Sequence, residues 1–198
     1  MDAQTLRDAP RVLSTKRLRL EAPRVEHAPA FLAMLNGSLA AWRFIGWGRE
    51  PRDLAWAERF CIRGAQYVDD GEDLIFTVFE TATDACIGRV DLHSFDFDAP
   101  RCEVGYAGNV AHAGRGLMRE AVQAVVALAF DLGIERVEAF SDLRNRRAIE
   151  FALALGFESE GVVRSRERDP KGLLCDQVLL ARLRPAATFD QAAMSVPL

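Results

Sequence analysis

The sequence predicts a single domain of the mixed α+β class, with a central, twisted, mostly antiparallel sheet of about six to seven strands flanked by about four helices. Three observations lead to this fold class. At 198 residues the chain fits one domain and can bury a sizeable core. Its 49% apolar and 27% charged residues are ordinary for a globular protein. Short β-rich runs and longer runs with helical spacing of apolar residues follow one another along the chain.

Alternating or β-rich runs predict the strands. Residues 18–21 alternate apolar and polar side chains, and Pro23 ends this run. Residues 74–79 and 87–93 are β-rich on either side of a turn at residues 81–84, which predicts an antiparallel hairpin. The remaining strands are expected at residues 101–107, 136–141, 160–167 and 173–180.

Apolar residues that recur at helical spacing predict the helices. They are expected at residues 25–35, 53–68, 117–132 and 145–155. Glycines follow three of these runs, namely Gly37, Gly71 and Gly156, and glycine is the residue that most often ends a helix.

We expect the domain to cover residues 12–183, with terminal tails at residues 1–11 and 184–198. The first residues are polar and unpatterned, which predicts a tail that orders only on contact with the body. The last residues show no partner within the chain, so this tail is expected either as a free end or as a segment that packs on another subunit.

Charge and cysteine content exclude several function classes. A net charge of −4 argues against nonspecific binding to nucleic acid. The four cysteines, Cys61, Cys86, Cys102 and Cys175, lie far apart without a C-x-x-C pair, so neither a metal site nor a disulfide framework is expected. The chain shows no signal region and no run near the ~18 apolar residues of a membrane span. We therefore expect a cytoplasmic protein without membrane contact.

A glycine turn opens the longest predicted helix. Residues 112–116, with Gly114 and Gly116, lie between the strand at 101–107 and the helix that starts at Leu117. Because a helix N-terminus carries unpaired N–H groups and a positive dipole end, this arrangement predicts a phosphate site. A Walker loop would require Gly-Lys-Ser/Thr, and a dinucleotide fingerprint would require a third glycine where Arg119 stands. Neither motif is present.

The glycine turn is one of three motifs that together resemble the GNAT acetyltransferases. The segment at 103–121 resembles the Glu-Val-Gly-Tyr strand and acetyl-CoA loop of that family, and Asn145 and residues 155–161 resemble its later motifs. The opening at residues 15–20 is similar to that of the RimJ/RimL subgroup. The resemblance covers roughly residues 12–183 and implies acetyl-CoA as co-substrate, with no metal.

The resemblance also implies which residues hold the cofactor, mostly through backbone amides. They are Val104, Gly105, Tyr106, His112, Ala113, Gly114, Arg115, Gly116, Leu117, Arg119 and Asn145. Ala111 stands where the family usually has Gln or Arg, which removes one side chain but no amide. Asn145 has two interpretations, because it could contact the cofactor arm or cap the helix that follows it.

The proton chemistry departs from the family pattern. Ala148 and Ala152 stand where relatives carry a serine or a tyrosine that can donate a proton. The remaining candidates are Glu103, His93, Asp91 and Ser141. We favour Glu103 acting through a water, because strand alternation puts it on one face with Gly105, where a water has room. His93 and Asp91 could instead be structural or solvated residues.

Aromatic residues cluster between the first two predicted helices. Trp42, Phe44 and Trp47 are expected either in the core or, as the resemblance implies, along the wall of the acceptor pocket.

The expected function is acetyl transfer from acetyl-CoA to a primary amine, above all a protein N-terminal α-amine, by direct attack in a ternary complex. Two alternatives stay open. One is a small acceptor such as a polyamine, an amino acid or an aminoglycoside; the other is a non-catalytic acyl-CoA-binding regulatory module. The expected partners are acetyl-CoA and the acceptor, and a homodimer is an open alternative.

Overall fold

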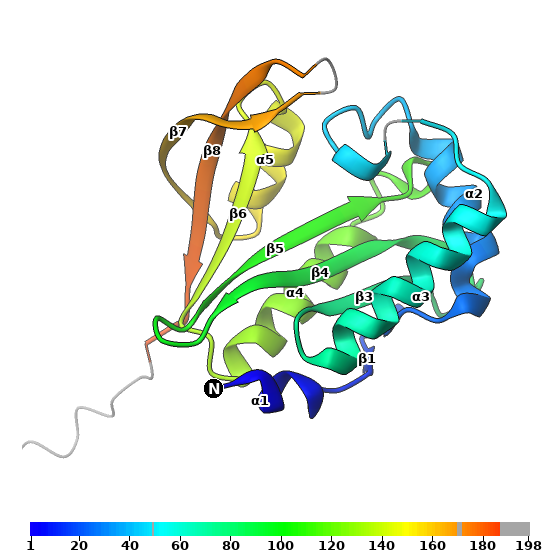
Figure 1. The fold of residues 1–198 in the computed structure, drawn as a ribbon, viewed down its shortest axis with the longest axis horizontal. Helices are drawn as coiled ribbons and strands as arrows, with labels where there is room; N and C mark the ends of the chain where they lie inside the picture. Colours follow the sequence, from blue (N-terminus) through cyan, green and yellow to red (C-terminus); the bar gives the residue numbers. More distant parts are fainter. Residues whose placement is uncertain (49, 170–171, 187–198) are drawn as a thin grey trace, which may run out of the picture.

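The computed structural model describes residues 1–48, 50–169 and 172–186, and in these ranges eight strands form one sheet (Figure 1). The strand order is β1-β2-β3-β4-β5-β6-β8-β7. Neighbouring strands are antiparallel except β5 and β6, which confirms the mostly antiparallel sheet. The strands are β1 (Val12–Ser14), β2 (Leu18–Glu21), β3 (Leu74–Glu80), β4 (Cys86–Asp96), β5 (Arg101–Gly108), β6 (Arg136–Asp142), β7 (Glu158–Arg168) and β8 (Leu174–Leu183).

Helices cover both faces of the sheet. α4 buries Ala121, Val122 and Val125 in the main core, against apolar residues of the central strands. α2 builds a second core with Phe31 and Leu35, and α3 packs beside it. Figure 1 shows α4 and α5 behind the sheet and α3 in front of it. The helices are α1 (Ala3–Arg7), α2 (Ala28–Ser38), α3 (Leu54–Asp70), α4 (Leu117–Asp131) and α5 (Arg146–Ala154).

Local capping explains where the helices begin and end. The Asp53 carboxylate accepts a hydrogen bond from the Trp56 amide at 2.7 Å and opens α3, which ends at Gly71 in the left-handed conformation with φ of 72°. α2, in contrast, continues through Asn36 to Ser38. The Asn36 side chain is held by the Arg52 backbone, with both hydrogen bonds at 3.0 Å, so this tertiary contact replaces the stop that the sequence suggests.

The N-terminal segment adds one helix and one strand to those that the sequence predicts. Residues 1–11 were expected as a tail that orders only on contact with the body, and α1 does pack on the end of α3, with Leu6 fully buried and an Arg7 hydrogen bond to the Asp70 carbonyl at 3.0 Å. β1 pairs with β2. These elements give no periodic signal, because Leu6 and Ala9 are the only buried apolar residues in α1 and its end. Of the expected C-terminal tail, residues 187–198 lie outside the described part of the chain.

The parallel pair β5 and β6 separates along its length. The two strands pair only from Arg101 to Glu103 and from Arg136 to Glu138. Beyond these residues β5 remains paired with β4, and β6 with β8, so the facing edges of β5 and β6 have no strand partner (Figure 1). This opening in the sheet positions the site.

Within the residues that the structure describes, none of the helices combines the length and the apolar character needed to cross a bilayer.

Candidate active site

Two cavities lie where β5 and β6 separate. The first, which we call the loop cavity, has a volume of about 420 Å³ and lies against the glycine turn, the start of α4 and one side of α5. The second, the sheet cavity, has a volume of about 390 Å³ and lies between β4 and β5 on one side and the β7–β8 hairpin on the other. Both are lined by Phe44, Ile45, Tyr106, Ala107, Asn145 and Ala148, so they share one wall.

The glycine turn has the geometry of an anion site. Gly116 is the residue before α4 and adopts φ of 74°, and Gly114 adopts φ of 79°. Both values lie in the left-handed region, which glycine occupies without steric cost. A side chain at Gly114 would meet no atom within 4 Å, so the space beside the turn is open. The unpaired amides at the start of α4 therefore face a cavity that a phosphate could enter.

Hydrogen bonds anchor the glycine turn and the start of α4 to the segment between β1 and β2. The Glu120 carboxylate, in the first turn of α4, accepts hydrogen bonds from the Thr15 hydroxyl at 2.6 Å and the Arg17 amide at 2.9 Å. Burial acts to raise the pKa of Glu120, but the hydrogen bonds from Thr15 and Arg17 outweigh it and hold this pKa below its ordinary value. Arg17 also donates to the Arg115 carbonyl at 3.0 Å. The turn is thus fixed before any ligand binds.

The structure distributes the residues expected at the cofactor over both cavities. The loop cavity is lined by His112, Ala113, Gly114, Gly116, Leu117 and Arg119; the sheet cavity is lined by Val104 and Gly105; and Tyr106 and Asn145 line both. Arg115 differs from the expectation, because it lines neither cavity. Its guanidinium is ion-paired with Glu80 and lies 2.8 Å from the His112 Nδ1 atom. Arg147, a possible phosphate contact that the sequence favoured less than Arg115 and Arg119, lines the loop cavity beside Arg119.

Asn145 caps α5. Its side-chain oxygen accepts a hydrogen bond from the Ala148 amide at 3.4 Å, which is the capping alternative of the sequence analysis. The residue nevertheless lines both cavities, so the cap stands at their shared wall.

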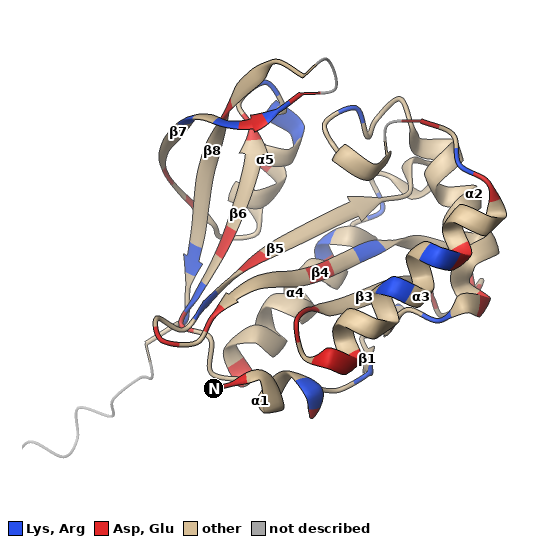
Figure 2. Ribbon diagram, in the orientation of Figure 1, with Lys and Arg blue, Asp and Glu red and all other residues tan. Residues whose placement is uncertain are grey.

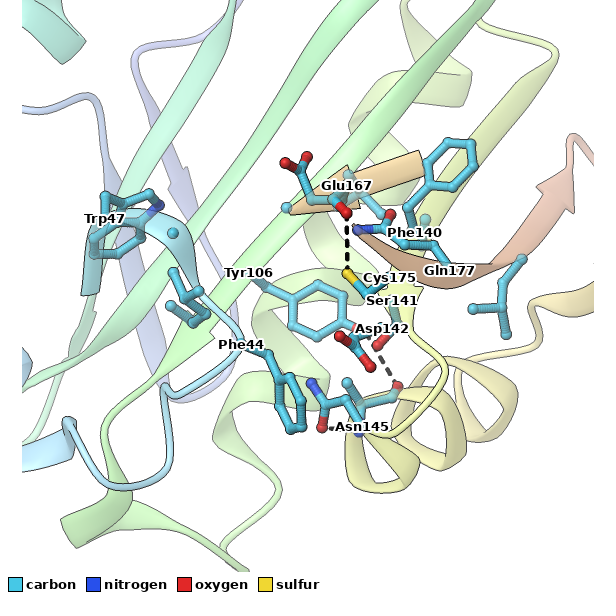
Figure 3. Close-up of a pocket in the computed structure, with 18 of the residues that line it drawn as sticks. Phe44, Trp47, Tyr106, Phe140, Ser141, Asp142, Asn145, Glu167, Cys175 and Gln177 are labelled. Atoms are coloured by element: carbon cyan, nitrogen blue, oxygen red, sulfur yellow. Dashed lines mark hydrogen bonds between the residues drawn. The ribbon is translucent and has the colours of Figure 1, made fainter. Parts of the chain in front are cut away.

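The tryptophans expected at the acceptor pocket lie in different places. Trp42 is 3% exposed, belongs to the second core and donates from Nε1 to the Gly108 carbonyl at 2.9 Å. It borders the loop cavity and not the sheet cavity, and its hydrogen bond holds it at the end of β5. Trp47 lines the sheet cavity, and Phe44 lines both cavities. Figure 3 shows Trp47 and Phe44 on one side of the sheet cavity, with Glu167, Cys175 and Gln177 on the other.

Four carboxylates line the sheet cavity, and three of them have a cationic partner. Asp91 lies 3.1 Å from Arg89 and 3.7 Å from the His93 Nε2 atom. Arg144 binds Asp142 at 2.6 Å and Asp169 at 3.3 Å. Hydrogen bonds from Arg144 lower the pKa of Asp142 to about 2. The four are Asp91, Asp142, Glu167 and Asp169.

Glu167 is the carboxylate of the sheet cavity that has no cationic partner among the described residues. Its carboxylate accepts a hydrogen bond from the Arg168 amide at 3.0 Å. The sequence analysis did not single out Glu167, because it is one of several charged residues in β7. The register of β7 against β8 shifts between Val163 and Glu167, and Ser165 has φ of 52°, so simple alternation cannot tell which charge faces the cavity.

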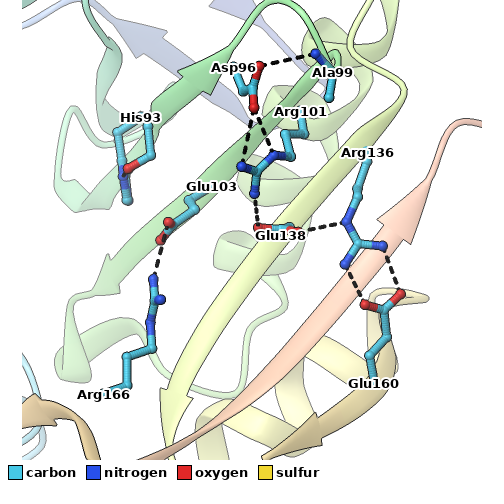
Figure 4. Close-up of polar contacts among 10 residues, drawn as sticks. His93, Asp96, Ala99, Arg101, Glu103, Arg136, Glu138, Glu160 and Arg166 are labelled. Carbon is cyan, nitrogen blue, oxygen red and sulfur yellow. Dashed lines mark hydrogen bonds and ion pairs between the residues drawn. The ribbon is translucent and has the colours of Figure 1, made fainter. Parts of the chain in front are cut away.

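Glu103 lies on the same face of β5 as Gly105, as strand alternation suggests. Its carboxylate contacts Arg166 at 3.4 Å, however, and lines neither cavity (Figure 4). The Arg166 guanidinium in turn stacks 3.6 Å from the centre of the Phe140 ring. Of the other candidates, His93, Asp91 and Ser141 all line the sheet cavity.

Below the cavities the strands are joined by a chain of ion pairs. Glu138 accepts from Arg136 at 2.7 Å and from Arg101 at 3.5 Å, and Arg101 also contacts Asp96 at 3.2 Å (Figure 4). Both signs of charge are interspersed along β5, β6, β7 and β8 (Figure 2). Within the described ranges, no group of three or more His, Cys, Asp or Glu side chains is arranged to hold a metal ion.

Comparison with known proteins places this site in a family. A model of the acetyltransferase (GNAT) domain matches residues 17–158. The uncharacterized N-acetyltransferase p20 of Bacillus licheniformis is 31% identical over 116 residues, which are 58% of this chain and 65% of that protein. The probable N-acetyltransferase YjcK of Bacillus subtilis (strain 168) is 33% identical over 120 residues, 60% of this chain and 66% of that protein. The chain thus spans just under two thirds of the length of these relatives.

The fold is also that of a solved acetyltransferase. RimL, the ribosomal L7/L12 α-N-protein acetyltransferase, in its complex with coenzyme A, superposes with a TM-score of 0.80 at 18% identity, covering 89% of this chain and 99% of that one. The glycine turn, the separated strands and the match over residues 17–158 lead to one conclusion: the chain belongs to the GNAT acetyltransferase family.

Proposed function

We propose that this protein transfers an acetyl group from acetyl-CoA to a primary amine, and that the amine is the N-terminal α-amine of a protein. The observation that carries the proposal is the shared wall of the two cavities, which Tyr106, Asn145 and Ala148 help to form. One cavity has the features of a diphosphate site and the other is lined by carboxylates. A donor and an acceptor could therefore occupy the two cavities together and meet at this wall, as direct attack requires.

The residues around the loop cavity fit acetyl-CoA. The amides after Gly114 and Gly116 would bind the pyrophosphate, and Arg119 and Arg147 line the same cavity and would add positive charge. The edge of β5 that faces β6 is unpaired beyond Glu103, so its main chain would pair with the amides of the pantetheine arm. The strand separation would thus guide the thioester toward Tyr106.

The sheet cavity fits an amine that arrives with a positive charge. An α-amine has an ordinary pKa near ~8, so at neutral pH most of it is the ammonium form, which carboxylates attract. The attack needs a base, because only the neutral amine is a nucleophile. Glu167 is the cavity carboxylate without an ion pair among the described residues, so we assign it this role, directly or through a water. Glu103 stays the alternative that the sequence alone favours.

Two observations support a protein N-terminus over a small amine. In the part of the chain that the structure describes, no helix lies on the front face of β6, β8 and β7, so a polypeptide could lie along it and insert its first residue into the cavity (Figure 1). The likeness to RimL, which acts on the α-amine of a ribosomal protein, points in the same direction. A volume of about 390 Å³ is within the ordinary range for a ligand site and would hold a chain end.

The test is a thiol-release assay with acetyl-CoA and a panel of acceptors. The panel contains short peptides with free N-termini, the same peptides with blocked N-termini and an internal lysine, and small amines of the polyamine, amino acid and aminoglycoside classes. We expect CoA release with free N-termini alone, and mass spectrometry should find the acetyl group on the α-nitrogen. Release with small amines alone would establish the small-molecule alternative. Acetyl-CoA binding without release would establish a regulatory module.

A further inference from the structure

The Tyr106 hydroxyl lies at the wall that the loop cavity and the sheet cavity share. Tyr106 lines both cavities, and its hydroxyl donates to the Ala148 carbonyl at 3.4 Å, near the start of α5. Figure 3 shows its ring reaching from β5 between Phe44 and Asp142 toward this helix. With acetyl-CoA in the loop cavity and the amine in the sheet cavity, the thioester would lie beside this hydroxyl.

The existing hydrogen bond leaves this hydroxyl available. An O–H···O hydrogen bond is ordinarily about 2.7–2.8 Å long, so the contact of 3.4 Å with Ala148 is weak. A hydroxyl hydrogen rotates to the best acceptor within reach. The Tyr106 ring is fixed by its contact with Phe151, with ring centres 5.1 Å apart, so the hydroxyl oxygen holds its position while its hydrogen can turn.

The neighbouring helix offers no competing donor. The sequence of α5, RRAIEFALA, contains no serine, threonine or tyrosine, and Ala148 is the α5 residue at the shared wall. Ser141 lines the sheet cavity but not the loop cavity. Of the residues that line both cavities, Tyr106 is the one with a hydroxyl group. Asn145 lines both as well, but its side-chain oxygen is already used to cap α5.

We propose that the Tyr106 hydroxyl donates a hydrogen bond to the thioester sulfur as the carbon–sulfur bond breaks. This inference rests on the acetyl transfer proposed above. The amine nitrogen forms the new bond to the carbonyl carbon, and the electron pair of the broken bond stays on sulfur. The amine gives its proton to Glu167, which passes it to solvent, and the thiolate takes a proton from solvent. Tyr106 keeps its own proton throughout, so no further reactant is needed.

Acidity explains why Tyr106 acts as a hydrogen-bond donor and not as an acid. Burial raises the pKa of Tyr106 to about 12. A cysteine-type thiol has an ordinary pKa of about 8.5, so the pKa of Tyr106 lies about 3.5 above that of the thiol, and moving the Tyr106 proton to such a thiolate would be unfavourable. A hydrogen bond to a developing negative charge is stronger than one between neutral groups, and it is made only as the charge appears. This hydrogen bond therefore increases the rate of acetyl transfer and does not change the affinity for acetyl-CoA.

The experiment compares Tyr106→Phe with a second variant that returns a hydroxyl to the same wall. Tyr106→Phe removes one oxygen and keeps the ring. We expect kcat to fall about 10- to 100-fold, the usual effect of one charged hydrogen bond, while KM for acetyl-CoA stays near wild type. Adding Ala148→Ser to this variant places a hydroxyl beside the vacated position and should restore most of kcat. The control is Tyr67→Phe, which removes the other tyrosine hydroxyl of the chain, bonded to Arg63 on α3.

The outcomes separate this inference from the proposed function. Wild-type protein that releases no CoA with any amine would overturn the acetyl transfer itself. Active wild type with an equally active Tyr106→Phe protein would overturn only the role of Tyr106. A loss of kcat that Ala148→Ser does not relieve, together with a lower unfolding temperature, would show that the hydroxyl serves packing and would also overturn the inference.

Discussion

Asp91 lies opposite Gly105 across the β4–β5 ladder, and its carboxylate covers the place where a side chain on residue 105 would stand. A Cβ atom built on Gly105 would lie 2.6 Å from the Asp91 Oδ2 atom, closer than packed atoms can approach. The sequence suggested that a carboxylate faces this glycine and assigned it to Glu103 on the same strand. In the structure the carboxylate comes from the neighbouring strand, and it lines the sheet cavity.

The first prediction follows from this contact. Gly105→Ala should force Asp91 away from β5 and lower the free energy of unfolding by about 1–3 kcal/mol, the usual cost of overpacking. Adding Asp91→Ala to this variant should relieve the clash. The double variant should therefore lose less free energy of unfolding than the losses of Gly105→Ala and Asp91→Ala added together. Urea unfolding of the four proteins measures this coupling. Strictly additive losses would mean that the two residues do not compete for space.

The second prediction distinguishes the two candidate bases. Glu167→Gln should lower kcat by about 10²-fold at neutral pH, and part of the loss should return at higher pH, because an α-amine with a pKa near ~8 then loses its proton to solvent. Glu103→Gln is the matched control, since it breaks the contact with Arg166 and leaves the lining of the sheet cavity intact. We expect near wild-type kcat for it. The opposite pattern in the pH–rate profiles would return the role to Glu103.

The third prediction separates the two tryptophans. Trp47→Ala should raise KM for the acceptor more than KM for acetyl-CoA, because Trp47 lines the sheet cavity and not the loop cavity. Trp42→Ala should instead lower the free energy of unfolding by about 3–5 kcal/mol, as truncation of a fully packed aromatic residue does. Steady-state kinetics and chemical unfolding of both variants test this. Similar kinetic changes for the two would contradict the assignment.

The fourth prediction concerns the glycine turn. Gly116→Asp should weaken acetyl-CoA binding on the order of 100-fold, because a carboxylate at the start of α4 would repel the pyrophosphate. Gly116→Asn is the control. Asn and Asp both tolerate the left-handed backbone that Gly116 adopts with φ of 74°, and they have nearly the same shape. Calorimetric titration should show a much smaller loss for Asn. Equal losses would assign the effect to the side chain's size and not to its charge.

The sequence alone determined the features that depend on neighbouring residues. The alternation of residues 18–21 and the helical spacing from Leu117 onward predict elements that the structure contains as β2 and α4. The glycine turn before α4 was predicted because Gly114 and Gly116 adopt a backbone conformation that few other residues tolerate. The order of the motifs was enough to predict the family, since each motif lies within one short stretch of chain.

Only the tertiary structure decided which side chains meet in the cavities. β5 separates from β6 because it stays paired with β4, its neighbour in the sequence, whereas β6 pairs with β8, which follows only after α5 and β7. Glu103 is drawn to Arg166, 63 residues later in the chain, and no local pattern contains that contact. Glu167 reaches the cavity wall past a register shift in β7, where strict alternation no longer holds. Local periodicity specifies the faces of regular elements, whereas a site built across strands depends on long-range contacts and on the irregular positions between them.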